Sequence, residues 1–166
     1  EKNTMLKGLL DNKSCRECKI CCGFDRTDIW EMPVMNTETF KKLSEIRPET
    51  EFIQKDGAYV VKAPELEGDE LFFCPALDSE KGCMLGDKKP FDCSIWPYRI
   101  MELGGFLVIT ICPVCEELYN RPLSQLVGFL EKGLGEKIYN YAQKHPEIVK
   151  EYEYSYPILK VFGKQG

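Results

Sequence analysis

Apolar residues follow a helical spacing in the last third of the chain, beyond residue 115. They recur at three- and four-residue steps, which indicates one face of a helix. The positions are Leu123, Leu126, Val127, Leu130, Leu134, Ile138 and Tyr141. Pro122 fits the first turn of such a helix, and Pro146 is expected to close it. Glycines at positions 128, 133 and 135 are expected to bend or break it.

A second helix is predicted at residues 37–46, where Asn36 is suited to cap the first turn. This helix is expected to end at Arg47, because Pro48 follows and the residue before a proline avoids the helical conformation.

Two further regions predict β-hairpins. Residues 51–63 place strand-prone side chains on both sides of Asp56-Gly57, a dipeptide that favours a tight turn. Residues 95–103 and 106–111 flank Gly104-Gly105, and glycine tolerates the positive φ angles that such a turn needs.

Together these elements predict an α+β fold, a single small domain with two β-hairpins, cysteine-bearing loops and a C-terminal helical segment. The length of 166 residues suits one domain. Its cysteine core would span residues 15–115, and its helical part residues 116–150. A polar lead-in occupies residues 1–14. The tail at 152–162 alternates aromatic and polar residues and is expected to form an edge strand or a wrapping arm.

Composition and charge narrow the classes of partner. Hydrophobic residues make up 43% of the chain and charged residues 30%, which is typical of a soluble globular protein. The net charge of -5 argues against a nucleic-acid partner and against docking on an anionic membrane. Apolar runs stay well short of the roughly 20 residues of a membrane span.

Nine cysteines are the outlying feature of the composition. Their odd number and close spacing favour metal binding over disulfides, and a chain of this length does not need cross-links to form a core. Thiols kept for metal are typical of a reducing compartment, so a cytoplasmic location is expected.

The densest group of thiols comprises Cys15, Cys18, Cys21 and Cys22. Three cysteines at successive two-residue gaps reproduce the first three positions of a bacterial ferredoxin cluster sequence. In ferredoxins the ligand set of such a cluster is completed by a remote cysteine that precedes a proline. The present chain offers two such dipeptides, Cys74-Pro75 and Cys112-Pro113. Because adjacent side chains diverge, Cys22 is either a bystander or a ligand of a second metal.

A second pair of closely spaced thiols, Cys112 and Cys115, keeps a zinc site open as an alternative. With Cys15 and Cys18 this pair could form a tetrahedral four-cysteine zinc site. Thiolate ligands alone leave the metal ambiguous, because tetrahedral sulfur suits both zinc and iron–sulfur clusters.

The order of these motifs resembles the family of zinc- or iron-chelating domains named for the CxxCxxCC motif. In that family the opening quartet precedes a Cys followed by a Leu, a Gly-Cys, an Arg-Pro-x-x-Cys-Arg-x-Phe-Pro stretch and a later Cys-Pro. A related cysteine segment occurs in flagellin lysine methylases, which resemble iron–sulfur enzymes. The matching positions here are the quartet at 15–22, Cys74 with Leu77, Gly82-Cys83, Lys89-Pro90 with Cys93 and Trp96-Pro97, and Cys112-Pro113. Lys89, Ser94 and Trp96 replace the Arg, Arg and Phe of the family pattern.

The resemblance implies eight metal-ligating thiolates and an iron–sulfur cofactor, expected as [4Fe-4S], with zinc as the alternative. The cluster would transfer electrons or support a redox or group-transfer reaction with a redox or protein partner that the sequence does not identify. The alternative is a non-catalytic zinc module in an interaction or structural domain. A catalytic acid–base set is not recognisable, because His145 is the only histidine. The expected ligands are Cys15, Cys18, Cys21, Cys22, Cys74, Cys83, Cys93 and Cys112.

Cys18 and Cys115 are therefore predicted to differ in their effect on metal content. Replacing a true ligand leaves the metal under-coordinated, so Cys18→Ser should lose metal. Cys115 lies outside the family pattern, so Cys115→Ser should keep it. Metal content per chain measures the difference, and equal loss in both variants would make Cys115 a ligand and restore the paired zinc site.

Overall fold

The computed structural model of the chain describes residues 22–27, 29–113 and 120–164. The predicted lead-in at 1–14 lies outside these residues, as do four of the nine cysteines. They are Cys15, Cys18, Cys21 and Cys115.

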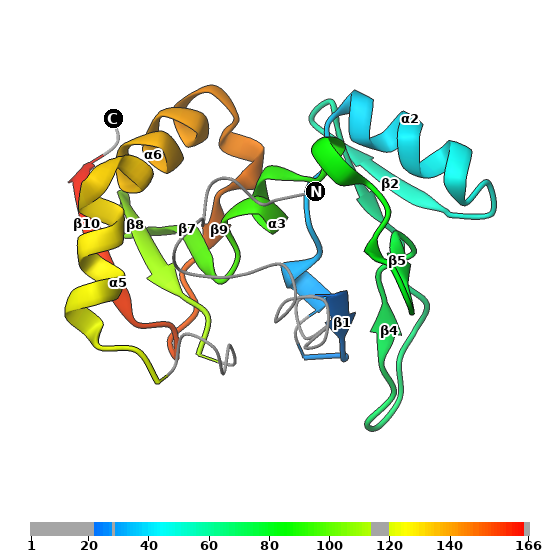
Figure 1. Cartoon of the computed structure of the whole chain (residues 1–166), viewed down its shortest axis with the longest axis horizontal. Coiled ribbons are helices and arrows are strands. Elements are labelled where there is room, and N and C mark those ends of the chain that lie inside the picture. The colour runs from blue at the N-terminus through cyan, green and yellow to red at the C-terminus, as the bar shows by residue number, and fades with distance from the viewer. Residues whose placement is uncertain (1–21, 28, 114–119, 165–166) are drawn as a thin grey trace. The chain divides into compact units, whose positions relative to one another are not determined.

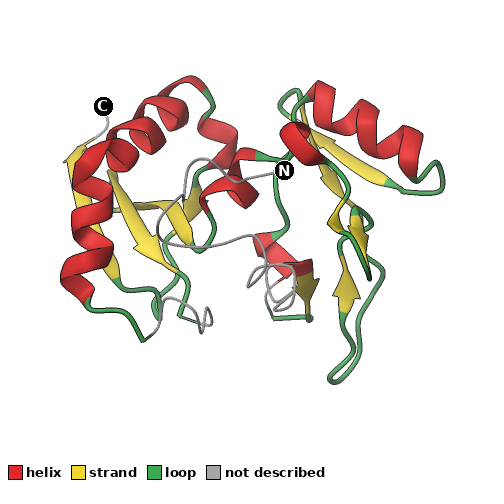
Figure 2. Ribbon diagram, in the orientation of Figure 1, coloured by secondary structure: helices red, strands yellow, loops and turns green. Residues whose placement is uncertain are grey.

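The fold is α+β, as predicted, with small antiparallel sheets, one four-stranded sheet and a C-terminal helical segment (Figures 1 and 2). The chain divides into two compact units, whose described residues are 22–27 and 29–94 in unit 1, and 95–113 and 120–164 in unit 2. The expectation of a single domain stays a prediction. Each unit is described by itself.

The predicted helix of unit 1 is α2 (Thr37–Ile46). The side-chain oxygen of Asn36 accepts a hydrogen bond from the Thr39 backbone N–H at 2.9 Å, which satisfies one of the unpaired donors of the first turn. The Arg47 N–H donates to the Leu43 carbonyl at 2.8 Å and ends the helix before Pro48. The cap and the end are therefore those predicted.

The first predicted hairpin pairs β2 (Phe52–Lys55) with β3 (Ala58–Val61). Its turn residues Asp56 and Gly57 have φ angles of 51° and 77°, the pair of positive angles that a two-residue hairpin loop requires. The hairpin packs on α2 through aromatic rings. Phe40 stacks on Tyr59 with ring centroids 4.0 Å apart.

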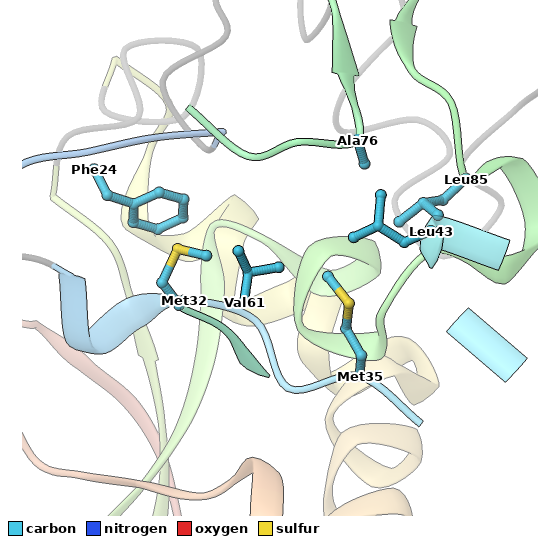
Figure 3. Close-up of a cluster of buried hydrophobic side chains, with 7 residues drawn as sticks. All are labelled: Phe24, Met32, Met35, Leu43, Val61, Ala76 and Leu85. Atoms are coloured by element: carbon cyan, nitrogen blue, oxygen red, sulfur yellow. The ribbon is translucent and has the colours of Figure 1, made fainter. Parts of the chain in front are cut away.

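A cluster of buried hydrophobic side chains forms the core of unit 1 (Figure 3). It combines residues of α2 and β3 with residues of short segments that the sequence analysis did not assign. Cys74 and Cys83 are among the partly buried residues that pack against this cluster. The cluster consists of Phe24, Met32, Met35, Leu43, Val61, Ala76 and Leu85.

Several short elements complete unit 1. Strands β1 (Gly23–Phe24) and β4 (Phe72–Phe73) form one antiparallel pair, and β5 (Leu77–Asp78) and β6 (Gly82–Cys83) form another. The remaining elements are the 3-10 helices η2 (Ile29–Glu31) and η3 (Gly86–Lys88), and the short helix α3 (Phe91–Ile95), which ends at the first residue of unit 2.

Unit 2 is built on the second predicted hairpin, β7 (Tyr98–Leu103) and β8 (Phe106–Ile111). Its turn residues Gly104 and Gly105 have φ angles of 59° and 89°. The first strand begins later than predicted, because Ile95 ends α3 and the Trp96-Pro97 peptide, which is cis, precedes the strand.

Two strands flank this hairpin in a sheet of order β10-β8-β7-β9. The tail forms β10 (Ile158–Lys164), which is antiparallel to β8 and lies at the edge, one of the two predicted outcomes. Its register with β8 shifts twice, between Ile158 and Lys160 and between Val161 and Lys164. The short strand β9 (Lys150–Glu151) is parallel to β7.

The C-terminal helical segment runs through α5 (Leu123–Phe129), the π-helical turn η4 (Leu130–Leu134) and α6 (Gly135–Lys144). Gly133 has a non-helical φ of 123° inside η4, whereas Gly128 lies within α5 without breaking it. Pro146 begins the 3-10 helix η5 (Pro146–Ile148), so the helical segment closes where predicted.

The helical segment buries most of the predicted face. Leu126, Leu130, Leu134 and Ile138 are buried, but Leu123 at the start is 61% exposed. The hydroxyl of the fully buried Tyr98 donates to the Leu126 carbonyl at 2.9 Å, and burial raises the pKa of Tyr98. This hydrogen bond ties β7 to α5. In the part of the chain that the structure describes, none of the helices combines the length and apolarity needed to span a bilayer.

The cap of α2 gives a first stability prediction. Asn36→Ala removes the acceptor of the Thr39 N–H and should lower the free energy of unfolding by about 1 kcal/mol. Asn36→Asp keeps an acceptor at this position and serves as the matched control. Urea denaturation followed by circular dichroism measures both variants, and equal stability of the two would contradict the capping role.

Candidate metal centre

The predicted metal ligands are divided between the described parts of the chain and the residues outside them. Cys22, Cys74, Cys83 and Cys93 lie in unit 1, and Cys112 lies in unit 2. Cys15, Cys18 and Cys21 lie outside the described residues.

The backbones of Cys22 and Cys74 meet just beyond the end of the β1–β4 ladder. The register pairs Gly23 with Phe73, and the Cys74 N–H donates to the Cys22 carbonyl at 2.7 Å. The ladder itself ends at Gly23 and Phe73, and Cys22 lies in a 3-10 turn just before it. Bond geometry limits the two Cα atoms joined by this hydrogen bond to a separation of at most about 6.6 Å. The structure therefore brings the backbones of these two cysteines together from distant parts of the sequence.

Aromatic residues determine the register of this ladder. Phe24 belongs to the buried core cluster, and its partner Phe72 packs against the same cluster. On the alternate positions, a Cβ atom on Gly23 would lie only 3.1 Å from the ring of Phe73. Glycine at position 23 therefore leaves room for the Phe73 ring over the ladder.

Cys83 is connected to this pair through the β5–β6 ladder. The Leu77 N–H donates to the Cys74 carbonyl at 2.9 Å, and Leu77 is the register partner of Cys83. Cys74 and Cys83 pack against the same hydrophobic cluster, and both are partly buried. Three of the predicted ligands thus belong to one connected part of unit 1.

The turn between β5 and β6 is stabilised by the carboxylate of Asp78. It accepts hydrogen bonds from the backbone N–H groups of Lys81 at 2.8 Å and Glu80 at 2.9 Å. These two hydrogen bonds favour the ionised form and lower the pKa of Asp78, which is half-buried. The turn that leads into Cys83 therefore contains an ionised carboxylate at neutral pH.

Cys93 lies on α3, where its N–H donates to the Pro90 carbonyl at 3.0 Å. The neighbouring Asp92 is 4% exposed, and its carboxylate accepts a hydrogen bond from the Val34 N–H at 3.1 Å. This bond fixes α3 against the segment that precedes α2. Asp92 therefore has a positioning role that the sequence analysis did not assign to it.

The chain between Cys83 and α3 is held to α2 by polar contacts. The ammonium of Lys42 donates to the Leu85 carbonyl at 2.7 Å, and the Thr39 hydroxyl donates to the Lys88 carbonyl. Lys88 in turn forms an ion pair with Glu38 at 2.9 Å, and the hydrogen bond in this pair raises the pKa of Lys88. These contacts hold η3 on α2.

Cys112 has a different environment from the cysteines of unit 1. It is 3% exposed, and its Sγ lies 3.6 Å from the hydroxyl oxygen of Tyr156. Its backbone N–H donates to the Pro97 carbonyl at 2.8 Å, which continues the β7–β8 ladder by one residue. The structure thus places this predicted ligand in the interior of unit 2.

The described residues do not form a complete metal site among themselves. They contain no group of three or more His, Cys, Asp or Glu side chains that could hold a metal ion. Nor does a disulfide join any two of the five described cysteines. Cys22 and Cys74 therefore offer two thiol donors, and a centre that includes them needs ligands from outside the described residues.

His145 does not contribute to this group. Its Nδ1 atom lies 3.2 Å from a carboxylate oxygen of Glu147, and its ring stacks on Tyr141 with centroids 4.4 Å apart. All three residues lie at the end of α6 and in η5, within unit 2.

Comparison of the chain with models of protein families, with curated proteins and with solved structures gives no match.

The buried carboxylate beside Cys93 gives a second stability prediction. Asp92→Ala removes the acceptor of the Val34 N–H and should lower the free energy of unfolding by about 1–3 kcal/mol, the usual cost of leaving a buried donor unsatisfied. Asp69→Ala, at an exposed position, is the control and should change it very little. Denaturant unfolding of both variants measures the effect, and a loss no larger than that of the control would contradict this role of Asp92.

Proposed function

We propose that the chain holds an iron–sulfur cluster through cysteine thiolates, as [4Fe-4S], and uses it for electron transfer or a redox or group-transfer reaction. The proposed ligands are those predicted from the sequence. The observation that carries the proposal is the hydrogen bond from the Cys74 N–H to the Cys22 carbonyl, which holds a remote cysteine opposite the end of the N-terminal cysteine cluster.

The sequence motif and this hydrogen bond support the same ligand set. A ferredoxin-type triplet needs a remote Cys-Pro as its fourth ligand. Of the two such dipeptides in the chain, Cys74-Pro75 continues β4, whose partner β1 directly follows the cluster at 15–22. This favours Cys74 over Cys112 as the residue that completes the first cluster. It also makes Cys22 a neighbour of the cluster rather than a distant bystander.

The surroundings of Cys74 and Cys83 suit thiolate ligation. Both side chains are partly buried against an apolar core, and partial burial limits solvent access, one of the factors that set the potential of a cluster. When bound, the cluster would supply one-electron chemistry. The residues of the chain would hold it, limit access of water and leave an exposed side for exchange with a partner.

The partner of such a centre is proposed to be a redox protein or another protein. The net charge of -5 gives no electrostatic basis for binding nucleic acid or an anionic membrane as the partner. The motif order that resembles the CxxCxxCC domains is consistent with this proposal, and we propose membership of that family on the same residues. A zinc module remains the second candidate, because Cys112 and Cys115 have the spacing of a zinc-binding pair.

Anaerobic purification followed by metal analysis tests the proposal. We expect iron, acid-labile sulfide and a broad visible absorption that bleaches on reduction. A colourless protein with stoichiometric zinc and no sulfide, after the same anaerobic work, would replace the iron–sulfur proposal by the zinc module. A protein with neither metal would remove both.

Serine variants test whether Cys22 and Cys74 bind one centre. If they do, Cys22→Ser, Cys74→Ser and the double variant should each lose the same amount of metal per chain, because the first substitution already empties the site. Cys115→Ser is the matched control and should keep its metal. If the loss of metal in the double variant equals the sum of the losses in the two single variants, the two thiols belong to separate centres.

A further inference from the structure

The thiols of Cys22 and Cys74, which lie directly before β1 and directly after β4, suit a second chemistry besides metal ligation. Disulfide formation requires Cα atoms roughly 4.4–6.8 Å apart. The backbone hydrogen bond of 2.7 Å from the Cys74 N–H to the Cys22 carbonyl limits the separation of their Cα atoms to at most about 6.6 Å, which falls inside this range. A small movement at the end of the ladder and rotation of the side chains can therefore bring their sulfurs together.

We propose that Cys22 and Cys74 form a redox modification site, a reversible cross-strand disulfide made by exchange with a small-molecule disulfide such as glutathione disulfide. The Cys22 thiolate attacks one sulfur of glutathione disulfide, forms a mixed disulfide and releases one glutathione thiolate. The Cys74 thiolate then attacks the Cys22 sulfur and releases the second glutathione. Overall the two protein thiols lose two electrons and two protons, and glutathione disulfide is reduced to two molecules of glutathione.

The other three described cysteines lack this arrangement. Cys93 lies on α3, where its N–H donates to the Pro90 carbonyl and not to another cysteine. Cys83 has Leu77 as its partner across β5–β6, so no thiol lies opposite it. Cys112 is 3% exposed beside Tyr156 in unit 2, where a small-molecule oxidant has little access. Cys22 and Cys74 are both partly exposed, which allows attack on a small disulfide.

The ladder also explains why this disulfide would be reversible. The backbones on both sides are already fixed by the buried Phe24 and by Phe72, so the bridge must adapt to the ladder rather than the reverse. Disulfides that are strained or exposed are the ones that are easily reduced. The geometry therefore points to a labile bond and not to a structural cross-link.

The disulfide and the metal would compete for the same two sulfurs. This consequence, unlike the disulfide itself, rests on the proposed function. Oxidation of the pair would remove Cys74 from the cluster that it is proposed to complete and would also take the Cys22 sulfur from metal ligation, and a bound metal would protect the pair from oxidation.

Peptide mapping of the full chain tests the inference. The protein is purified anaerobically and divided into two samples, one kept as isolated and one stripped of metal by a chelator. Each sample is incubated with glutathione disulfide, then alkylated and digested with trypsin. Cys74 is the only cysteine of the tryptic peptide 63–81, and Cys22 shares the peptide 20–26 with Cys21. We expect a cross-link between these two peptides in the metal-stripped protein, with the loss of both thiols and their full recovery after dithiothreitol. A mixture of pairings in denaturing urea would show that the folded ladder directs the bond.

Two variants assign the sulfur within peptide 20–26. Cys21→Ser should keep the cross-link and Cys22→Ser should lose it. Cross-links of Cys74 to other cysteines, or glutathione mixed disulfides alone, would overturn the inference. These outcomes are read from the peptide map of the unmodified sequence, so they do not depend on whether a variant folds. Metal and sulfide content of the isolated protein test the proposed function separately, so a metal-free protein that forms the cross-link would retain this inference and remove the other.

Discussion

One backbone hydrogen bond, from the Cys74 N–H to the Cys22 carbonyl, joins two cysteines of unit 1 that are remote in sequence. It extends a ladder of only two residue pairs, which would be marginal in isolation. Burial of Phe24 in the core, with Phe72 packed against the same cluster, supplies the stability that so short a ladder lacks. A slip of one residue in either strand would turn the phenylalanine of that strand away from the core and break the hydrogen bond between the cysteines, so hydrophobic burial holds their backbones in register.

The elements that could be predicted from the sequence are those with strong local signals. Helix α2 has its cap at Asn36 and its end before Pro48, and both hairpins have turn dipeptides that accept positive φ angles. Strands β1, β4, β5 and β6 could not be predicted in this way, because two residues are too few to show a period. Their pairing follows from tertiary packing on the core cluster.

The candidate site shows the same division between local and tertiary information. Cysteine spacing identifies the candidate thiols, but it cannot identify which remote thiol meets the N-terminal cluster. That depends on Gly23, whose lack of a side chain makes room for the Phe73 ring, and on the register of β1 with β4. The positioning role of Asp92 was missed for a similar reason, since its acceptor function depends on Val34, which is remote in sequence.

The irregular register of β10 has a consequence for how the sheet of unit 2 ends. A regular edge strand presents unpaired N–H and C=O groups at even intervals, and another chain can use them as a template for a further strand. The two shifts in β10 interrupt that interval at both ends of the strand, and bulged edges also twist away from the plane of the sheet. An added strand could match only a short part of this edge before its hydrogen bonds fell out of step. The sheet is thereby protected on this side against growth into intermolecular β-structure.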